Sequence, residues 1–241
     1  MALFEIKNLT KNFGGLRAVD NLNLFINEGG ILGLIGPNGA GKTTVFNLVN
    51  GFFSPDSGGI LFKGENIEGS RPDVICKKGI GRVFQLVKPF GDMTVLDNVV
   101  VGVFSRVVSA KEAKKEARSV LDFVGLLKKK DILAGSLTIA DRKRLELARA
   151  LATEPKLLLL DELFAGLNPK ETEEAVALVQ KIRDMGVTIF VIEHVMQAVM
   201  TLSERIAVLH HGKKIAEGSP QEVAKDEDVI KAYLGGEYVF A

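Results

Sequence analysis

The chain has 241 residues, of which 46% are hydrophobic, and its 31 basic and 30 acidic residues leave a formal net charge of +1. That near balance argues against a general nucleic-acid-binding protein, which is usually basic as a whole. A single cysteine, Cys76, excludes an internal disulfide and a multi-cysteine metal site. The length fits one large domain or two small ones.

Neither the N-terminus nor the apolar stretches predict membrane insertion. The N-terminal stretch MALFEIKNLTKNFGG lacks the basic start and apolar core of a signal peptide. The longest apolar stretches, KLLLLDELFAG and VTIFVIEH, are much shorter than the ~20 residues that a membrane-spanning helix needs. We expect a soluble, intracellular chain, so that any membrane role comes through a partner.

Short apolar runs alternate with helical patterns along the chain. Several runs are continuous rather than alternating, which is typical of strands covered on both faces. The predicted strands are Leu3–Lys7, Leu22–Ile26, Ile31–Ile35, Ile60–Phe62, Leu157–Leu160, Val187–Ile192 and Ile206–Leu209.

Helix starts are marked by capping signals. These are a capping box of Ser109 with Glu112 in a helix that Gly125 follows, Asn168 with Pro169 in a helix that ends before Gly186, and Ser219-Pro220-Gln221-Glu222. A hairpin turn is predicted at His210–Lys214.

Between roughly Gln85 and Glu154 the pattern is helical, and strand-like sequence returns at Leu157. We therefore predict an α/β fold that forms one domain over residues 1–241. A helical subdomain would be inserted in it at about 86–155.

The stretch ILGLIGPNGAGKTTVFNLVNG carries the strongest functional signal. An apolar strand leads into Gly36-Pro37-Asn38-Gly39-Ala40-Gly41-Lys42-Thr43-Thr44 and then into an amphipathic helix. This is a phosphate-binding loop in the strand–loop–helix context that such loops require. Its glycines let backbone N–H groups turn toward phosphate oxygens, and the helix presents its N-terminus to the anion. We expect Lys42 to meet the β- and γ-phosphates and the Thr43 hydroxyl to bind Mg²⁺.

A second apolar strand ends in Asp161-Glu162, within PKLLLLDELFAGLNPKE. Ligands bind at the carboxyl ends of parallel strands in open α/β sheets. Asp161 is placed there to hold Mg²⁺, and Glu162 to polarise the attacking water, a role worth ~10²–10⁴ in rate. Taken alone, the pair is more often an ordinary strand end, but the phosphate loop favours the catalytic interpretation.

Two more polar residues lie at boundaries. His194 follows the strand in TIFVIEHVM, and although a lone histidine there is more often structural, we expect this one near the γ-phosphate. Gln85 stands where the helical insert begins, and we interpret it as a sensor of Mg²⁺ that moves the insert.

In their order along the chain, these motifs and Ala165-Gly166-Leu167-Asn168 resemble the ATP-binding subunits of ABC transporters, over about Leu3 to Gly236. The stretches LTKNFGGLRAVDNL, GIGRVFQLVKPFGDMTVLDNV, AGLNPKE and IEHVMQAVMTLSERIAVLHHGKKIAEGSP look most similar to the branched-chain amino-acid importer branch. The resemblance implies a P-loop NTPase core with a mixed sheet, an N-terminal antiparallel β part and the helical insert.

What the resemblance implies for function is an ATP-hydrolysing motor subunit, two of which sandwich two ATP molecules head to tail. At the nucleotide, the resemblance implies that Phe13 stacks on adenine, and that Gln85 and Asp161 complete the metal shell. Glu162 would be the general base and His194 the γ-phosphate switch. At the interfaces, Ala165–Asn168 would cross the dimer interface, and the insert around Leu86–Asn98 would form the groove for a permease's coupling helices.

The stretch SLTIADRKRLELARAL stands where the family's signature motif, Leu-Ser-Gly-Gly-Gln, is expected. Thr138 keeps a hydroxyl, Ile139 and Ala140 replace glycines, and Asp141 replaces glutamine. Thr138 and Asp141 have N-cap and N3 spacing, so we expect them to close the helix start on themselves. Asp141 also brings negative charge to a phosphate position, and we expect the basic run Arg142–Arg144 to offset part of it.

We therefore predict that this signature serves a partner's ATP poorly, and that the chain works in an asymmetric pair with a second ATP-binding subunit. A heterodimer is expected, and a homodimer stays open. A further departure is Leu163, where the family commonly has proline.

The resemblance also implies integral-membrane permeases and a periplasmic or extracellular substrate-binding protein as partners, no nucleic acid, and a peripheral place on the cytoplasmic face of the inner membrane. Two alternatives stay open. One is a soluble ABC ATPase without transport, such as an assembly or repair factor, and the other is a nucleotide-dependent binding module that hardly hydrolyses ATP.

Overall fold

Two β-sheets share one hydrophobic core in the computed structural model, which describes residues 2–85 and 88–234. The smaller sheet is antiparallel, in the order β2-β1-β4-β5. Its strands are β1 (Ala2–Phe13), β2 (Leu16–Asn27), β4 (Ser57–Phe62) and β5 (Glu65–Asn66).

The larger sheet has six strands in the order β10-β9-β3-β8-β7-β6. They are β3 (Ile31–Ile35), β6 (Ile80–Val83), β7 (Leu157–Asp161), β8 (Thr188–Ile192), β9 (Arg205–His210) and β10 (Lys213–Gly218). All neighbours are parallel except β9 and β10, which form an antiparallel hairpin. The predicted α/β fold with a mixed sheet and an antiparallel β part is therefore confirmed.

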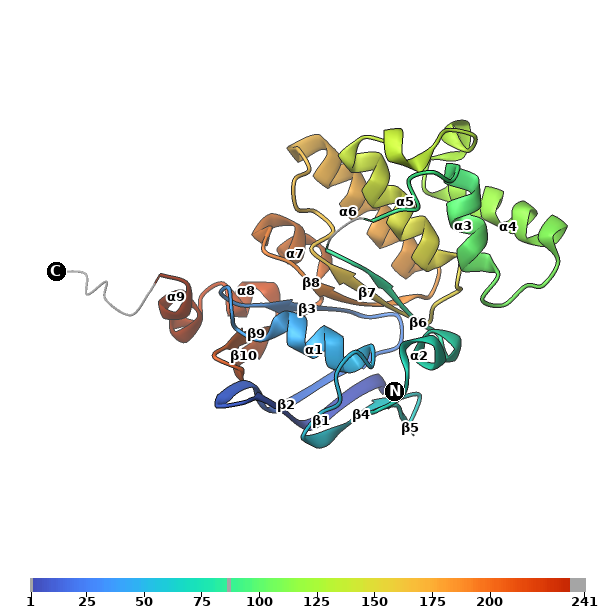
Figure 1. Cartoon of the computed structure of the whole chain (residues 1–241). Coiled ribbons are helices and arrows are strands. Elements are labelled where there is room, and N and C mark those ends of the chain that lie inside the picture. Colours follow the sequence, from blue (N-terminus) through green and yellow to red (C-terminus); the bar gives the residue numbers. More distant parts are fainter. Residues whose placement is uncertain (1, 86–87, 235–241) are drawn as a thin grey trace.

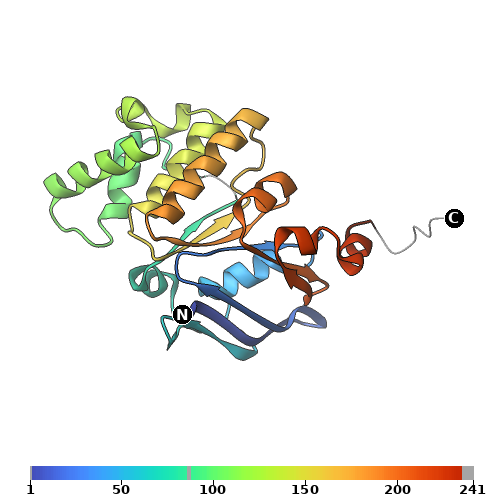
Figure 2. The same cartoon turned by 180° about the vertical axis from the view of Figure 1, so that it is seen from behind.

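Helices cover the larger sheet on both faces. Helix α1 (Lys42–Val49) lies between the two sheets, where four of its side chains join the core. Helices α3 (Val95–Val103), α4 (Ala110–Phe123), α5 (Ile139–Leu151), α6 (Pro169–Asp184) and α7 (Met196–Leu202) contribute to the cluster on the opposite face. Figures 1 and 2 show α3, α4 and α5 grouped at the end of the molecule away from the antiparallel sheet.

The remaining helices are short. They are α2 (Pro72–Lys78), α8 (Pro220–Val223) and α9 (Glu227–Leu234), with 3₁₀ turns at Leu127–Lys129 and Ala134–Ser136. Within the described residues, no helix is both long and apolar enough to cross a membrane.

Strand lengths are where the sequence-based expectation and the structure differ most. Strands β1 and β2 run far beyond the predicted Leu3–Lys7 and Leu22–Ile26, because they pair with each other through polar residues and several register shifts. Strand β6 was not predicted at all, since IGRV contains a glycine and an arginine and shows no apolar run. It forms because its backbone pairs with β7.

The capping signals behave as expected with one difference. Asn168 and Ser219 form complete capping boxes with Glu171 and Glu222. Ser109 makes the first half only, as its side chain accepts the backbone N–H of Glu112 at 3.4 Å.

Candidate functional site

The loop Gly36–Thr43 connects the carboxyl end of β3 to the N-terminus of α1. Backbone packs against it from two sides. A Cβ on Gly36 would lie 2.1 Å from the Leu209 carbonyl oxygen, and one on Gly41 would lie 2.3 Å from that of Ala18. Both glycines also have positive φ, at 150° and 106°. No other residue fits these positions, so β2 and β9 fix the shape of the loop.

The N-terminus of α1 is open to an anion. Gly41 at the N-cap provides no side-chain cap, and the first turn has no acidic residue. Lys42 Nζ folds back onto the loop and donates to the carbonyls of Gly36 at 2.6 Å and Pro37 at 3.0 Å. Burial lowers the pKa of Lys42, whereas the charges of Glu162 and Asp161 raise it. The loop thus combines backbone donors, a helix end and a cation.

Glu162, Gln85 and His194 meet at the same edge of the larger sheet. Gln85 Nε2 donates to Glu162 Oε2 at 2.5 Å, and His194 Nδ1 lies 3.6 Å from the same oxygen. The three residues follow β6, β7 and β8, which are adjacent parallel strands. The carboxyl ends of such strands point the same way, so residues distant in sequence converge.

Asp161 ends β7 in a nearly buried ion pair. Its Oδ2 lies 2.6 Å from an Arg82 nitrogen, and the two side chains are 2% and 5% exposed. Its Oδ1 is buried without a hydrogen-bond partner in the described part of the chain. Burial raises the pKa of Asp161, whereas the bond to Arg82 lowers it. Arg82 thereby helps to keep this carboxylate ionised.

The oxygens near Asp161 fit a magnesium ion. Thr43, Gln85 and Asp161 line one cavity, and they offer a hydroxyl, an amide and the unpartnered carboxylate oxygen. Mg²⁺ prefers such hard oxygen donors, and it commonly takes one or two carboxylates together with substrate phosphates.

That cavity of about 680 Å³ extends from Thr43, Gln85 and Asp161 to the helical insert. Arg82 lies in its wall, with its guanidinium 4.7 Å from the ring centroid of Phe84 and bonded to Asn47 at 2.8 Å. The insert contributes Val101, Gly102, Glu146, Arg149, Ala150 and Thr153. Of the stretch Leu86–Asn98 that was expected to form this groove, residues 86–87 lie outside the described residues and only Lys88 of the others lines the cavity.

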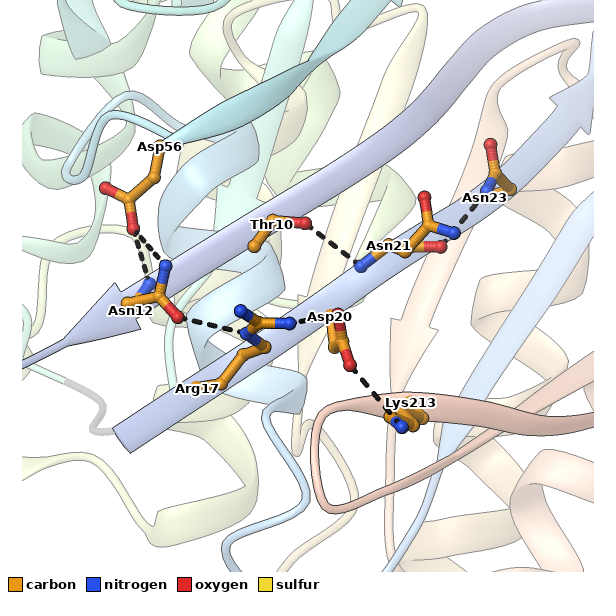
Figure 3. Close-up of polar contacts among 8 residues, drawn as sticks. All are labelled: Thr10, Asn12, Arg17, Asp20, Asn21, Asn23, Asp56 and Lys213. Atoms are coloured by element: carbon orange, nitrogen blue, oxygen red, sulfur yellow. Dashed lines mark hydrogen bonds and ion pairs between the residues drawn. The ribbon is translucent and has the colours of Figure 1, made fainter. Parts of the chain in front are cut away.

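Phe13 ends β1 on the surface, 41% exposed. It packs edge-on against Phe53 at 5.2 Å, and Lys11 Nζ lies 5.5 Å from its ring centroid. Asp56 ties this strand end down, because it accepts the backbone N–H of Asn12 at 2.6 Å and the Lys11 ammonium at 2.9 Å. Figure 3 shows the polar network continuing through Arg17 and Asp20 to Lys213. The exposed ring of Phe13 is thus held in place by the polar contacts at the end of β1.

The altered signature is closed on itself, as expected. Thr138 is the N-cap of α5 and accepts the Asp141 N–H at 3.2 Å, while its hydroxyl donates to Asp141 Oδ2 at 3.0 Å. Asp141 is only 8% exposed. Lys129, from the preceding 3₁₀ turn, forms an ion pair with the same carboxylate oxygen. Asp141 is therefore occupied by two local partners.

Arg142, Lys143 and Arg144, which we expected to offset part of the charge of Asp141, do not contact its carboxylate. Arg142 donates to the Gly135 carbonyl, Lys143 to the Glu162 carbonyl, and Arg144 pairs with Glu174. Arg142 and Lys143 point elsewhere because they lie about 100° and 200° around the helix from Asp141, whereas Arg144 is drawn to Glu174. The cation that meets Asp141 is Lys129, which lies twelve residues earlier.

Two buried charges near the site were missed by the sequence interpretation. Glu193 is 1% exposed and accepts the backbone N–H of Phe164 at 2.7 Å. Lys143 is 6% exposed. Burial raises the pKa of Glu193 and lowers that of Lys143. The signal in the sequence was a charge within an apolar run, as in VIEH, but only the fold supplies the partners.

Comparison with known proteins gives one consistent picture. A family model described as "ABC transporter" matches residues 19–165, and one described as "Branched-chain amino acid ATP-binding cassette transporter" matches residues 213–239. The chain is 42% identical to the high-affinity branched-chain amino acid transport ATP-binding protein BraF of Pseudomonas aeruginosa, over 97% of this chain and 98% of that protein.

Solved structures agree. The crystal structure of a nucleotide-free ATP-binding cassette from an ABC transporter matches with a TM-score of 0.90 and 30% identity, over 98% of this chain and all of that one. A dimeric ATP-binding cassette in a post-hydrolysis state, bound to ADP and Pi, matches with a TM-score of 0.81 and 28% identity, over 90% of this chain and 98% of that one.

Proposed function

Since this chain belongs to the ABC transporter family as an ATP-binding subunit that hydrolyses ATP, we propose that it drives an importer of branched-chain or other hydrophobic amino acids. The observation that carries the motor role is the convergence of Gln85, Glu162 and His194 beside the phosphate loop. The cargo rests on the relatives, whose names state branched-chain amino acid transport. Since the relatives are transport proteins, a soluble ABC ATPase without transport is not favoured.

In the proposed nucleotide site, the loop residues 36–44 and the Lys42 ammonium bind the phosphates, through the backbone N–H groups of every loop residue except Pro37, and Phe13 stacks on adenine. Phe13 offers an exposed face that the Asp56 network holds in place. Thr43, Gln85 and Asp161 would hold Mg²⁺, which neutralises phosphate charge when bound. Arg82 orients Asp161 so that Oδ1 stays free for the metal shell.

Glu162 acts as the general base in this proposal. Its Oε2 is held between Gln85 and His194, which face it from neighbouring strand ends. A water placed between this oxygen and the γ-phosphate would lose a proton to Glu162 as it attacks. His194, whose side chain is 57% exposed beside Glu162, would contact the γ-phosphate.

We further propose an asymmetric pair with a second ATP-binding subunit. Asp141 puts a carboxylate at the N-terminus of α5, where it bonds to Thr138 and Lys129. These contacts support the proposal that the signature binds the partner's nucleotide weakly. The partner would supply an intact signature to this chain's phosphate loop, and the Ala165–Asn168 segment would cross the interface between the two subunits. A heterodimer follows, because a homodimer would have two weak sites.

The membrane partners in this proposal are two permeases and, outside the membrane, a substrate-binding protein. The chain would sit peripherally on the cytoplasmic face, with coupling segments of the permeases in the 680 Å³ groove. The groove offers a mixed surface, because its lining includes Phe52, Phe84 and the Glu146–Arg149 ion pair.

The proposal is tested by purifying the tagged chain from its native membranes in mild detergent and identifying what accompanies it by mass spectrometry. We expect two permeases and a second ATPase whose signature reads Leu-Ser-Gly-Gly. Vesicles that contain the assembled complex should take up leucine with ATP inside and fail to do so with Glu162→Gln. Recovery only from the soluble fraction, without permeases, would contradict the transport role.

A further inference from the structure

The backbone of Glu162 is held in an unusual conformation. Its φ is 51°, in the left-handed region that residues with a side chain rarely adopt. Its N–H donates to the Ile192 carbonyl at 2.9 Å, which ties the residue to β8. Backbone conformations of this kind persist only where surrounding contacts determine them, and they are common at active sites.

The carbonyl of Glu162 is held by Lys143, from the helical insert. Lys143 Nζ donates to that oxygen at 2.9 Å across the boundary between α5 and the loop after β7. Lys143 is 6% exposed, and burial lowers its pKa, whereas the negative charges of Glu193 and Glu162 act in the opposite direction. A buried ammonium is costly unless it is well paired, so this contact is a specific one.

Lys143 lies on the same helix as the altered signature. Helix α5 begins at Ile139, so Lys143 is two residues from Asp141. Any movement of α5 that followed events at the partner's nucleotide would therefore also move the Lys143 ammonium, because both lie on one helix. The ammonium is bonded to the residue whose side chain oxygen faces Gln85 and His194.

We propose that Lys143 is a positioning residue. It sets the orientation of the Glu162 side chain and so links the position of α5 to hydrolysis at this chain's own nucleotide. The proposal rests on the role of Glu162 as general base. It predicts that the nucleotide bound at one site of the pair affects hydrolysis at the other site through one charge-assisted hydrogen bond, from Lys143 to the Glu162 carbonyl.

The test is Lys143→Met in the assembled complex, with steady-state kinetics. We expect kcat to fall about 10–100-fold, because small displacements of a catalytic group have effects of that size. KM for ATP should change less than about twofold, since Lys143 does not reach the phosphates. Lys143→Arg should recover part of kcat, because it keeps a cationic donor. Arg144→Ala, which removes a partly exposed ion pair from the same helix, is the matched control and should retain full kcat.

A double-variant cycle separates positioning from general damage. If Lys143 acts through Glu162, then Lys143→Met should add no further loss to Glu162→Gln. A full additive loss would overturn the proposal, as would a rise in KM with kcat unchanged.

Hydrogen exchange gives a readout that does not require turnover. In the purified chain, Lys143→Met should speed exchange in the peptide that covers 161–166, whereas the strand peptide 157–160 should stay protected. Wild-type protection of 161–166 in this variant would overturn the proposal even if turnover changed. Because this measurement concerns the resting chain, it stands apart from the transport assay. A failed transport assay with increased exchange would contradict the proposed importer and leave the Lys143 link supported.

Discussion

The nucleotide-binding edge of the core and the signature segment of the insert differ in whether their carboxylates are available to a ligand. At the core edge, the Asp161–Arg82 pair leaves Oδ1 unpartnered in the described structure, and Glu162 faces two neutral or weakly basic side chains. At the signature, the Asp141 carboxylate is already engaged by Thr138 and Lys129. One region is prepared to receive a ligand and the other is closed on itself. A subunit that contains both is suited to an unequal pair.

The largest effect should come from changing the Glu162 carboxylate at the core edge to an amide, in contrast to the same change at the signature. We expect Glu162→Gln to lower turnover at this chain's site about 10²–10⁴-fold, because the general base is lost, and to leave ATP binding intact. The same change at Asp141, Asp141→Asn, should not lower turnover. ATPase assays and fluorescent nucleotide binding measure both. Equal losses for the two variants would remove the distinction between the regions.

Ion-pair removal provides the next comparison. Arg82→Met leaves the buried Asp161 unpaired, and we expect the free energy of unfolding to fall by about 3–5 kcal/mol. Lys129→Met breaks a pair in which the lysine is 44% exposed, and we expect a loss of about 1 kcal/mol or less. Urea denaturation of the purified chain measures both values. A loss below about 1 kcal/mol for Arg82→Met would mean that Asp161 finds another partner.

Restoring the signature should have a smaller effect in the opposite direction. In the reconstituted pair, Ala140→Gly with Asp141→Gln should raise turnover at the partner's site about 2–5-fold, which corresponds to the ~0.3–1 kcal/mol of one charge at a helix N-terminus. Glu162→Gln in the same chain silences its own site, so that only the partner's site is measured. Unchanged turnover would show that the altered signature already serves the partner's nucleotide.

The smallest expected effect concerns the pH dependence of stability. Burial raises the pKa of Glu193, so its contribution is fully present below the ordinary carboxyl pKa and is lost as pH rises through the raised value. Glu193→Gln keeps an acceptor for the Phe164 N–H and does not titrate. Relative to wild type, the variant should therefore gain Tm as pH rises from 5 to 8, by about 2–4 °C if the effect is near 1 kcal/mol. Lys143 and His194, which face Glu193, are the same in the wild type and in the variant. A Tm difference that is constant with pH would contradict this assignment.

Local sequence was enough to predict some parts of the site. The phosphate loop is contiguous, and its glycine spacing, lysine and flanking elements all lie within one stretch of chain. The closure of Thr138 on Asp141 was likewise predictable, because the N-cap and N3 positions are three residues apart. The adjacency of Glu162 and His194 could be anticipated because parallel strands end at a common edge, whereas the position of Gln85 could not be derived in this way, because β6 was not predicted.

Tertiary structure alone decided the partners of the buried charges. Arg82 with Asp161, Lys143 with Glu162, and Lys129 with Asp141 are separated by 79, 19 and 12 residues. No periodicity connects such pairs, since each depends on how a helix or strand is placed against another. Strand β6 and the long β1–β2 ladder also depend on pairing rather than on their own composition. The sequence thus determined which catalytic and binding residues are present. The fold determined which of their charged side chains are paired with one another and which can bind a ligand.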